Sequence, residues 1–138
     1  AFEKNNSVLV IFTGPHCFVS AAWYTDPQMG STWNYMTVQA KGKITFMDEA
    51  VTRNAVKAVS DKYTGTGSAS SYDQLPAAYI DHVVKAIVGF SIEVESIENT
   101  FKLSQNRDEV SQLNIIEQLE KRGDATSAAI ADEMKKRL

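Results

Sequence analysis

The sequence predicts a domain of the α+β class, in which an antiparallel, barrel-like sheet carries helices at one end. Strand-like apolar runs and alternating patterns dominate residues 8–47 and return at 87–97. Helical spacing of apolar residues marks residues 48–64, 76–86 and the region after 107. The chain has 138 residues, of which 43% are hydrophobic. A chain of this size and composition forms about one domain around one core.

The sequence predicts strands in the first half of the chain. The apolar run at residues 8–12 predicts a strand that is covered on both faces. Gly14 and Pro15 follow it and predict a break. A second strand is expected over residues 33–40, and Lys41-Gly42-Lys43 then predicts a tight hairpin turn into a third at 44–47.

The second half alternates between helices and one strand. Asp48 is a predicted N-cap, and Pro76 suits the start of a second helix. Alternation at residues 87–97 predicts a strand with one buried face. Val110, Leu113, Ile116 and Leu119 form an apolar helical stripe that ends at Gly123, and a last helix follows. We therefore expect a sheet domain over residues 1–106 and a C-terminal helical extension over 107–138.

Composition excludes several classes of protein. The longest apolar stretch is only strand-sized, so no membrane-spanning helix is expected. The single cysteine, Cys17, has no internal disulfide partner, which fits a reducing cytoplasm. The two histidines, His16 and His82, lack the spacing of a metal site, and no catalytic set is evident. His16 and Cys17 are neighbours on a strand, so their side chains are expected to point to opposite faces.

Charge argues against direct nucleic-acid binding. The net charge is −3, and the densest cationic cluster is residues 135–137 at the C-terminus. That cluster is typical of a helix end that compensates its own dipole. The last helix also carries Asp132 and Glu133, which would face phosphates unfavourably.

Two groups of residues are candidates for a binding site. Four large rings, Trp23, Tyr24, Trp33 and Tyr35, surround a Pro/Gly-containing loop, with Asn34 between two of them. They form either a corner of the core or a wall for a planar ligand. The polar segment from Lys102 to Arg107 precedes a helix. It is either an anion site at the helix start or a helix cap supplied by Ser104 or Asn106.

These segments resemble the PaiB-like FMN-binding proteins, a family of FMN-binding negative transcriptional regulators. The resemblance rests on matching blocks in matching order: Gly14-Pro15-His16, Ser20, Trp23-Tyr24, Thr32-Trp33-Asn34-Tyr35, Ile87-Val88-Gly89-Phe90 and Phe101-Lys102-Leu103-Ser104-Gln105-Asn106. It implies a split β-barrel of the pyridoxamine-phosphate-oxidase type, a homodimer, and FMN bound in clefts at the subunit interface. It also implies that this chain begins partway through the family's barrel, without the N-terminal strands.

The resemblance further implies a set of FMN contacts. Trp33 and Asn34 would lie near the flavin ring, whereas Lys102, Gln105 and Asn106 would supply polar contacts. His16 and Tyr24 are additional candidates. The function expected first is therefore an FMN-binding transcriptional regulator. The alternatives are a flavin-dependent oxidoreductase on the same fold and a truncated dimerisation module without flavin.

Overall fold

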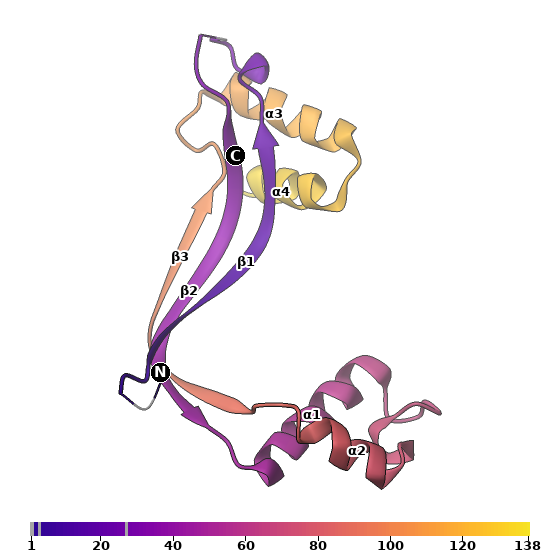
Figure 1. Ribbon diagram of the computed structural model, residues 1–138. Coiled ribbons are helices and arrows are strands. Elements are labelled where there is room, and N and C mark those ends of the chain that lie inside the picture. The colour runs from indigo at the N-terminus through magenta and orange to yellow at the C-terminus, as the bar shows by residue number, and fades with distance from the viewer. Residues whose placement is uncertain (1, 3, 27) are drawn as a thin grey trace. The chain divides into compact units, whose positions relative to one another are not determined.

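The computed structural model describes residue 2, residues 4–26 and residues 28–138. Its strands form one antiparallel sheet in the order β1-β2-β3 (Figure 1). The elements are, in chain order, β1 (Ser7–Val19), the 3-10 turn η1 (Ala21–Trp23), β2 (Thr32–Phe46), α1 (Glu49–Thr64), the 3-10 turn η2 (Tyr72–Gln74), α2 (Ala77–Val84), β3 (Phe90–Lys102), α3 (Glu109–Arg122) and α4 (Ala125–Lys135). The predicted α+β class is confirmed, while closure into a split barrel stays a prediction.

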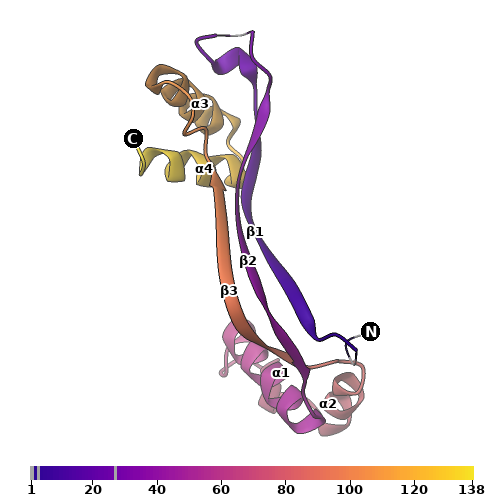
Figure 2. The ribbon, with the colours of Figure 1, turned by 90° about the vertical axis from the view of Figure 1, so that its left-hand side faces the viewer.

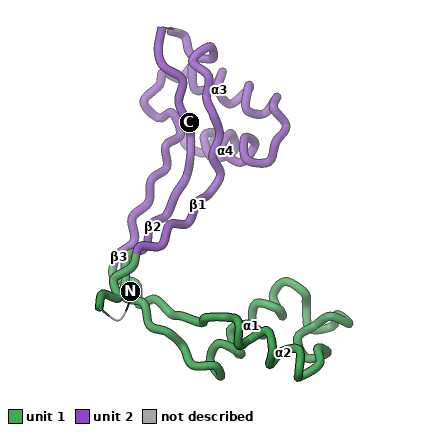
Figure 3. Tube along the Cα trace, in the orientation of Figure 1, with its two compact units in different colours: residues 1–8, 41–95 green, residues 9–40, 96–138 purple. Residues whose placement is uncertain are grey.

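The chain divides into two compact units (Figure 3). Unit 1 comprises residues 1–8 and 41–95, and unit 2 comprises residues 9–40 and 96–138. Each strand contributes residues to both units. The helices α1 and α2 belong to unit 1, and α3 and α4 belong to unit 2. The division at residue 106 expected from the sequence falls inside unit 2 and stays a prediction.

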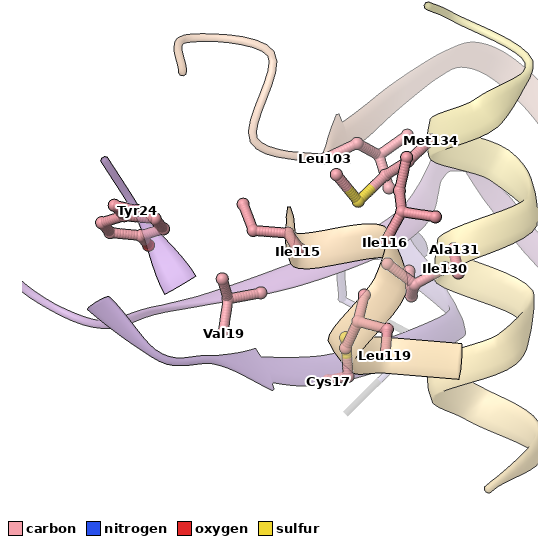
Figure 4. Packing of buried hydrophobic residues seen from close by; sticks show 10 residues of the cluster. All are labelled: Cys17, Val19, Tyr24, Leu103, Ile115, Ile116, Leu119, Ile130, Ala131 and Met134. Atoms are coloured by element: carbon pink, nitrogen blue, oxygen red, sulfur yellow. The ribbon is translucent and has the colours of Figure 1, made fainter. Parts of the chain in front are cut away.

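The core of unit 2 lies between its helices and one face of its strands. Helices α3 and α4 lie side by side in both ribbon views (Figure 2). Ten buried side chains form the cluster shown in Figure 4: Cys17, Val19, Tyr24, Leu103, Ile115, Ile116, Leu119, Ile130, Ala131 and Met134. Cys17 and Val19 are buried, whereas their neighbours His16 and Phe18 are exposed. The helices therefore cover one face of this part of β1 and leave the other open.

The predicted start of α1 and the predicted end of α3 are confirmed, whereas the cap predicted before α3 is wrong. Asp48 caps α1, because its Oδ1 accepts a hydrogen bond from Val51 N at 2.8 Å. Gly123 ends α3 with a φ of 72°, the left-handed conformation that favours glycine. The cap of α3 is Asp108, whose carboxylate accepts from Ser111 N at 2.9 Å. The caps considered from the sequence, Ser104 and Asn106, lie in the turn before it.

The predicted break at Gly14 and Pro15 is wrong, because β1 runs without interruption from Ser7 to Val19. β1 pairs with β2 alone in the described sheet and is therefore an edge strand. An edge strand can accept a proline, whose nitrogen has no hydrogen to donate, when that position faces away from the paired neighbour.

The predicted hairpin at residues 41–43 is also wrong, because β2 continues from Thr32 to Phe46. Gly42 lets β2 and β3 approach closely, because glycine has no Cβ. A Cβ at Gly42 would lie 2.2 Å from Glu93 O in β3, which no side chain can tolerate. The third strand of the sheet is β3, which begins at Phe90 and extends to Lys102, beyond the predicted end at residue 97.

Several predicted buried faces are open in this chain. Residues 9, 11 and 12 of β1 are exposed, as are Val88, Phe90 and Val94, which were predicted to form a buried face. In α3, Val110 and Leu113 are exposed, and the buried positions are Ser111, Ile115, Ile116 and Leu119. The face of α3 that packs inward is therefore the one formed by Ser111, Ile115, Ile116 and Leu119, which includes only part of the predicted stripe. Among the described residues, no helix combines the length and apolarity needed to cross a bilayer.

Candidate functional site

An exposed aromatic platform, defined here as His16, Phe18 and Trp33, lies on the open face of unit 2. His16 and Phe18 alternate along β1, and Trp33 lies on the adjacent strand β2. The Trp33 ring centroid is 6.2 Å from that of His16 and 6.0 Å from that of Phe18. Trp33 is 53% exposed. Such a row of accessible rings presents apolar, polarisable surface to a planar ligand.

Asn34 lies on the opposite face, in the core. It is fully buried, and its Oδ1 accepts a hydrogen bond from Ser104 Oγ at 3.0 Å. Its Nδ2 faces the sulfur of Met134 at 3.5 Å. Neighbouring strand residues point to opposite faces, so the structure separates Asn34 from Trp33. The amide of Asn34 therefore links β2 by hydrogen bonds to the turn after β3 and to α4.

Lys102 and Gln105 make internal contacts around that turn. Lys102 Nζ donates to Thr32 Oγ1, one residue before Trp33 in β2. Gln105 Oε1 accepts from Leu103 N at 2.7 Å, and its Nε2 donates to Phe101 O at 2.5 Å. The carboxamide of Gln105 therefore closes the turn onto its own backbone, whereas the ammonium of Lys102 lies beside the start of β2.

Tyr24 and Asn106 both line a pocket that is separate from the aromatic platform. The pocket has a volume of about 200 Å³ and lies between the loop after η1 and the start of α3. Its lining residues are Tyr24, Thr25, Asp26, Met29, Asn106, Arg107, Asp108 and Ser111. Tyr24 is 6% exposed, and its hydroxyl is buried without a hydrogen-bond partner. The predicted residues are thus distributed over the platform, the core turn and this pocket.

Sequence reasoning missed three of the residues that build these places. Phe18 was not selected, although it shares a face with His16 through the two-residue period of a strand. Thr25 and Asp108 were not selected either. Thr25 Oγ1 donates to Asp108 Oδ2 at 3.0 Å and ties the loop to α3. An acidic residue immediately before an apolar helical stripe is a cap signal that would have indicated Asp108.

Cys17 is held in its neutral form. Its side chain is buried, and desolvation raises the pKa of the thiol to about 11, despite the opposing effect of Arg122. A thiol with this pKa is protonated at neutral pH and is a poor nucleophile. No group of three or more potential metal ligands occurs among the described residues.

The protein is thus an α+β protein with an open, aromatic sheet face. Residues 1–96 match the family described as "Putative FMN-binding domain". The chain belongs to this family of FMN-binding domains, which confirms the resemblance to the PaiB-like proteins. The matched range includes the platform and ends before Lys102, Gln105 and Asn106.

Relatives extend the similarity along nearly the whole chain. The chain is 34% identical over 138 residues to Protease synthase and sporulation protein PAI 2 of Bacillus subtilis, covering 99% of this chain and 66% of the relative. It is 32% identical over 158 residues to an uncharacterized protein of Aspergillus fumigatus, covering 98% of this chain and 60% of the relative. A third relative, from Emericella nidulans, is 27% identical over 157 residues, covering 99% and 61%. The chain thus spans less than two thirds of the length of these relatives.

Proposed function

We propose that this chain binds FMN through the exposed aromatic platform and serves a regulatory role. The main observation behind this proposal is that Trp33 is exposed, with His16 and Phe18 beside it on the same open face. A flavin ring is planar and largely apolar, so it gains both burial and offset stacking on such a surface. The family match supports the same cofactor.

FMN also needs partners for its polar ring edge and its phosphate, and the residues present supply these only in part. Lys102 supplies a cation beside Thr32 at the start of β2. The side chain of Thr32 alternates with that of Trp33, so the contact of Lys102 with FMN would be at the end of the strand, to the polar edge or the phosphate. FMN, when bound, supplies a redox-active isoalloxazine ring. The amides of Asn34 and Gln105 are engaged internally and would support the site by holding the turn after β3.

We also propose that a second copy of the chain completes the site. Leu9, Ile11 and Phe12 are exposed on the edge strand β1. An apolar, unpaired strand edge of this kind favours association, and twofold symmetry is the commonest way to bury it. Sedimentation velocity at micromolar concentration should show a dimer. A stable monomer with bound FMN would contradict this part of the proposal.

The regulatory role rests on the resemblance, and the charges at the C-terminal end bear on how such a role would be carried out. One relative carries the name of a protease synthase and sporulation protein. In this chain, Lys135 pairs with Glu120, and both Lys136 and Arg137 pair with Glu133. The cationic cluster at the C-terminus is therefore compensated by carboxylates. This arrangement favours regulation through a partner over direct contact with nucleic acid.

Titration with FMN tests the proposal. Trp33→Ala should weaken FMN binding by about tenfold or more, because the largest ring of the platform is lost. Trp33 is half exposed, so the variant should remain folded, and circular dichroism checks this. The control is Tyr63→Ala on α1, which removes a more exposed ring from unit 1 and should leave FMN affinity unchanged.

A second variant tests the cation. Lys102→Met should weaken FMN binding by roughly ten- to a hundredfold if its ammonium contacts the ligand, because a charge-assisted hydrogen bond contributes about 1.5–3 kcal/mol. Unchanged FMN affinity in both Trp33→Ala and Lys102→Met would contradict the site. Complete bleaching of the bound flavin on turnover with NAD(P)H would instead favour the oxidoreductase alternative. No binding of FMN at all would favour the dimerisation module.

A further inference from the structure

Arg107 makes an unusual set of contacts at the start of α3. Its guanidinium lies over the ring of Tyr24, 4.3 Å from the centroid. Its Nη1 donates to the thioether sulfur of Met29. A thioether is a weak acceptor, and a guanidinium carries five donors that match oxyanions in pairs. The positive charge of Arg107 therefore has no oxygen acceptor for its side chain among the described residues.

Two other stacked arginines of unit 2 show the contrast. Arg122 lies 4.7 Å from the ring centroid of Trp23, and its Nη1 donates to Phe18 O at 2.7 Å. Arg137 also lies over an aromatic ring and donates to the backbone oxygen of Glu133 at 2.9 Å and to its carboxylate. Both guanidinium groups are thus paired with oxygen. Arg107 shares the stacking and lacks the oxygen.

Arg107 and Tyr24 both line the pocket of about 200 Å³ described above. Tyr24 contributes to its wall, and its hydroxyl is buried from solvent without a hydrogen-bond partner. The guanidinium of Arg107 is therefore the group of this pocket whose oxygen partner a ligand can supply.

The acidic residues of the pocket limit the chemistry of that ligand. Asp26 and Asp108 both line the hollow. The carboxylate of Asp108 is engaged by Thr25 Oγ1, by Ser111 N and by Ser111 Oγ. Asp26 accepts one hydrogen bond, from Gln28 N at 2.9 Å, and retains acceptor capacity. A dianionic phosphate would meet two carboxylates here, whereas a monoanion with a hydrogen-bond donor would be matched on both sides.

We propose that this pocket binds a small monocarboxylate that also carries a hydrogen-bond donor, namely an α-amino acid or an α-hydroxy acid. The carboxylate pairs with the guanidinium of Arg107 in place of Met29, and the ammonium or hydroxyl group donates toward Asp26. The volume suits a ligand of this size, which is smaller than a typical drug-sized ligand. The proposal does not rest on FMN binding at the platform.

Calorimetric titration of the full chain tests the proposal with defined probes. The probes are the twenty common L-α-amino acids individually, L-lactate, acetate and inorganic phosphate, each to about 10 mM. At least one amino acid or lactate should bind at least about tenfold more tightly than acetate or phosphate, because acetate has no donor for Asp26 and the phosphate dianion brings a second negative charge beside Asp26 and Asp108. Failure of every amino acid and of lactate to bind the folded protein would overturn the proposal.

Variants separate this pocket from general effects. Arg107→Gln should weaken the bound probe at least about tenfold, and Arg107→Lys should give an intermediate loss because it keeps the charge without the fork. The matched control is Arg122→Gln, which alters a stacked arginine outside the pocket lining and should leave probe affinity unchanged. Equal weakening in Arg122→Gln would overturn the proposal. Should Arg107→Gln not fold, Arg107→Lys carries the test.

Competition with FMN decides between two uses of the pocket. FMN affinity should be unaffected by a saturating amino acid or lactate and by Arg107→Gln. If phosphate binds more tightly than every carboxylate, or FMN displaces the bound probe, the pocket holds the flavin phosphate and the inference is wrong. Loss of FMN binding in Trp33→Ala with retained amino-acid binding would support a separate amino-acid site, because a change at the platform would then not affect the pocket.

Discussion

Ser104 Oγ donates a hydrogen bond of 3.0 Å to Asn34 Oδ1, and both side chains are buried in the core of unit 2. Ser104 is also the one described non-glycine residue with a positive φ, at 61°. This conformation strains a side-chain-bearing residue, so other contacts must hold it. The hydrogen bond to Asn34 is one of them, and it fixes the turn that follows β3.

Replacing Asn34 should therefore destabilise the protein strongly. Asn34→Ala removes the acceptor for Ser104, leaves a buried hydroxyl unpaired and opens space beside Met134, so a loss of about 2–4 kcal/mol in the free energy of unfolding is expected. Ser104→Gly is the matched variant. It loses the same hydrogen bond but relieves the positive φ and should cost less, at about 1 kcal/mol or below. Urea denaturation measures both, and a larger loss in Ser104→Gly would contradict this account.

Gly42 should not tolerate a side chain. Its added Cβ would meet Glu93 O at 2.2 Å and Ile92 Cγ2 at 2.9 Å, so Gly42→Ala must push β2 and β3 apart in unit 1. We expect a destabilisation of about 1–3 kcal/mol, as in other overpacked sites. Gly30→Ala is the control, because nothing lies within 4 Å of its added Cβ. A thermal melt of Gly42→Ala equal to that of Gly30→Ala would show that the strands are not so close.

The contrast between these glycines explains what could be predicted from the sequence. Helix starts at Asp48 and Pro76 and the stop at Gly123 were predicted, because caps act within a few residues. Gly42 and the break at Gly14-Pro15 were interpreted wrongly, since their roles depend on which strands lie beside them. Local sequence does not specify that neighbour.

The FMN-contact roles given to the rings and to the Lys102–Arg107 segment stay predictions, whereas the arrangement of these residues is described by the structure. Strand alternation already implied that Trp33 and Asn34 point to opposite faces. Which of the two faces α3 and α4 would cover was not predictable locally. The stacking of Arg107 on Tyr24 joins segments far apart in sequence, and only tertiary packing brings them together.

The caps of α3 and α4 should make stability depend on pH. Hydrogen bonds from the Ser111 side chain and backbone, and from Thr25, lower the pKa of Asp108. Hydrogen bonds from Ser127 N and Thr126 hold the pKa of Asp124 far below its usual value. Because both pKa values are lower in the folded state, the stabilisation is complete above the unfolded value, about 3.9, and is lost as the pH falls through the folded values.

Melting temperatures at pH 7 and pH 3 check this dependence. The double variant Asp108→Asn and Asp124→Asn keeps the cap acceptors but does not titrate, so it should lose less stability between the two pH values than the unaltered chain. Asp26→Asn is the control, since no helix is capped there. An identical acid-induced drop in the double variant and the unaltered chain would show that the two caps do not carry the pH dependence.

Cys17 should be nearly unreactive in the folded protein. Its pKa of about 11 leaves roughly 0.1% thiolate at pH 8, against about a quarter for an unperturbed thiol with a pKa of about 8.5. Burial under α3 and α4 restricts access further, since Cys17 packs in the same cluster as Ile115 and Leu119. Ellman's reagent at pH 8 should therefore react at least about a hundredfold more slowly with the native chain than with the chain in guanidinium chloride. Cys17→Ala gives the background rate. Fast labelling of the native chain, with unchanged circular dichroism, would mean that unit 2 opens around β1 far more often than its packed core implies.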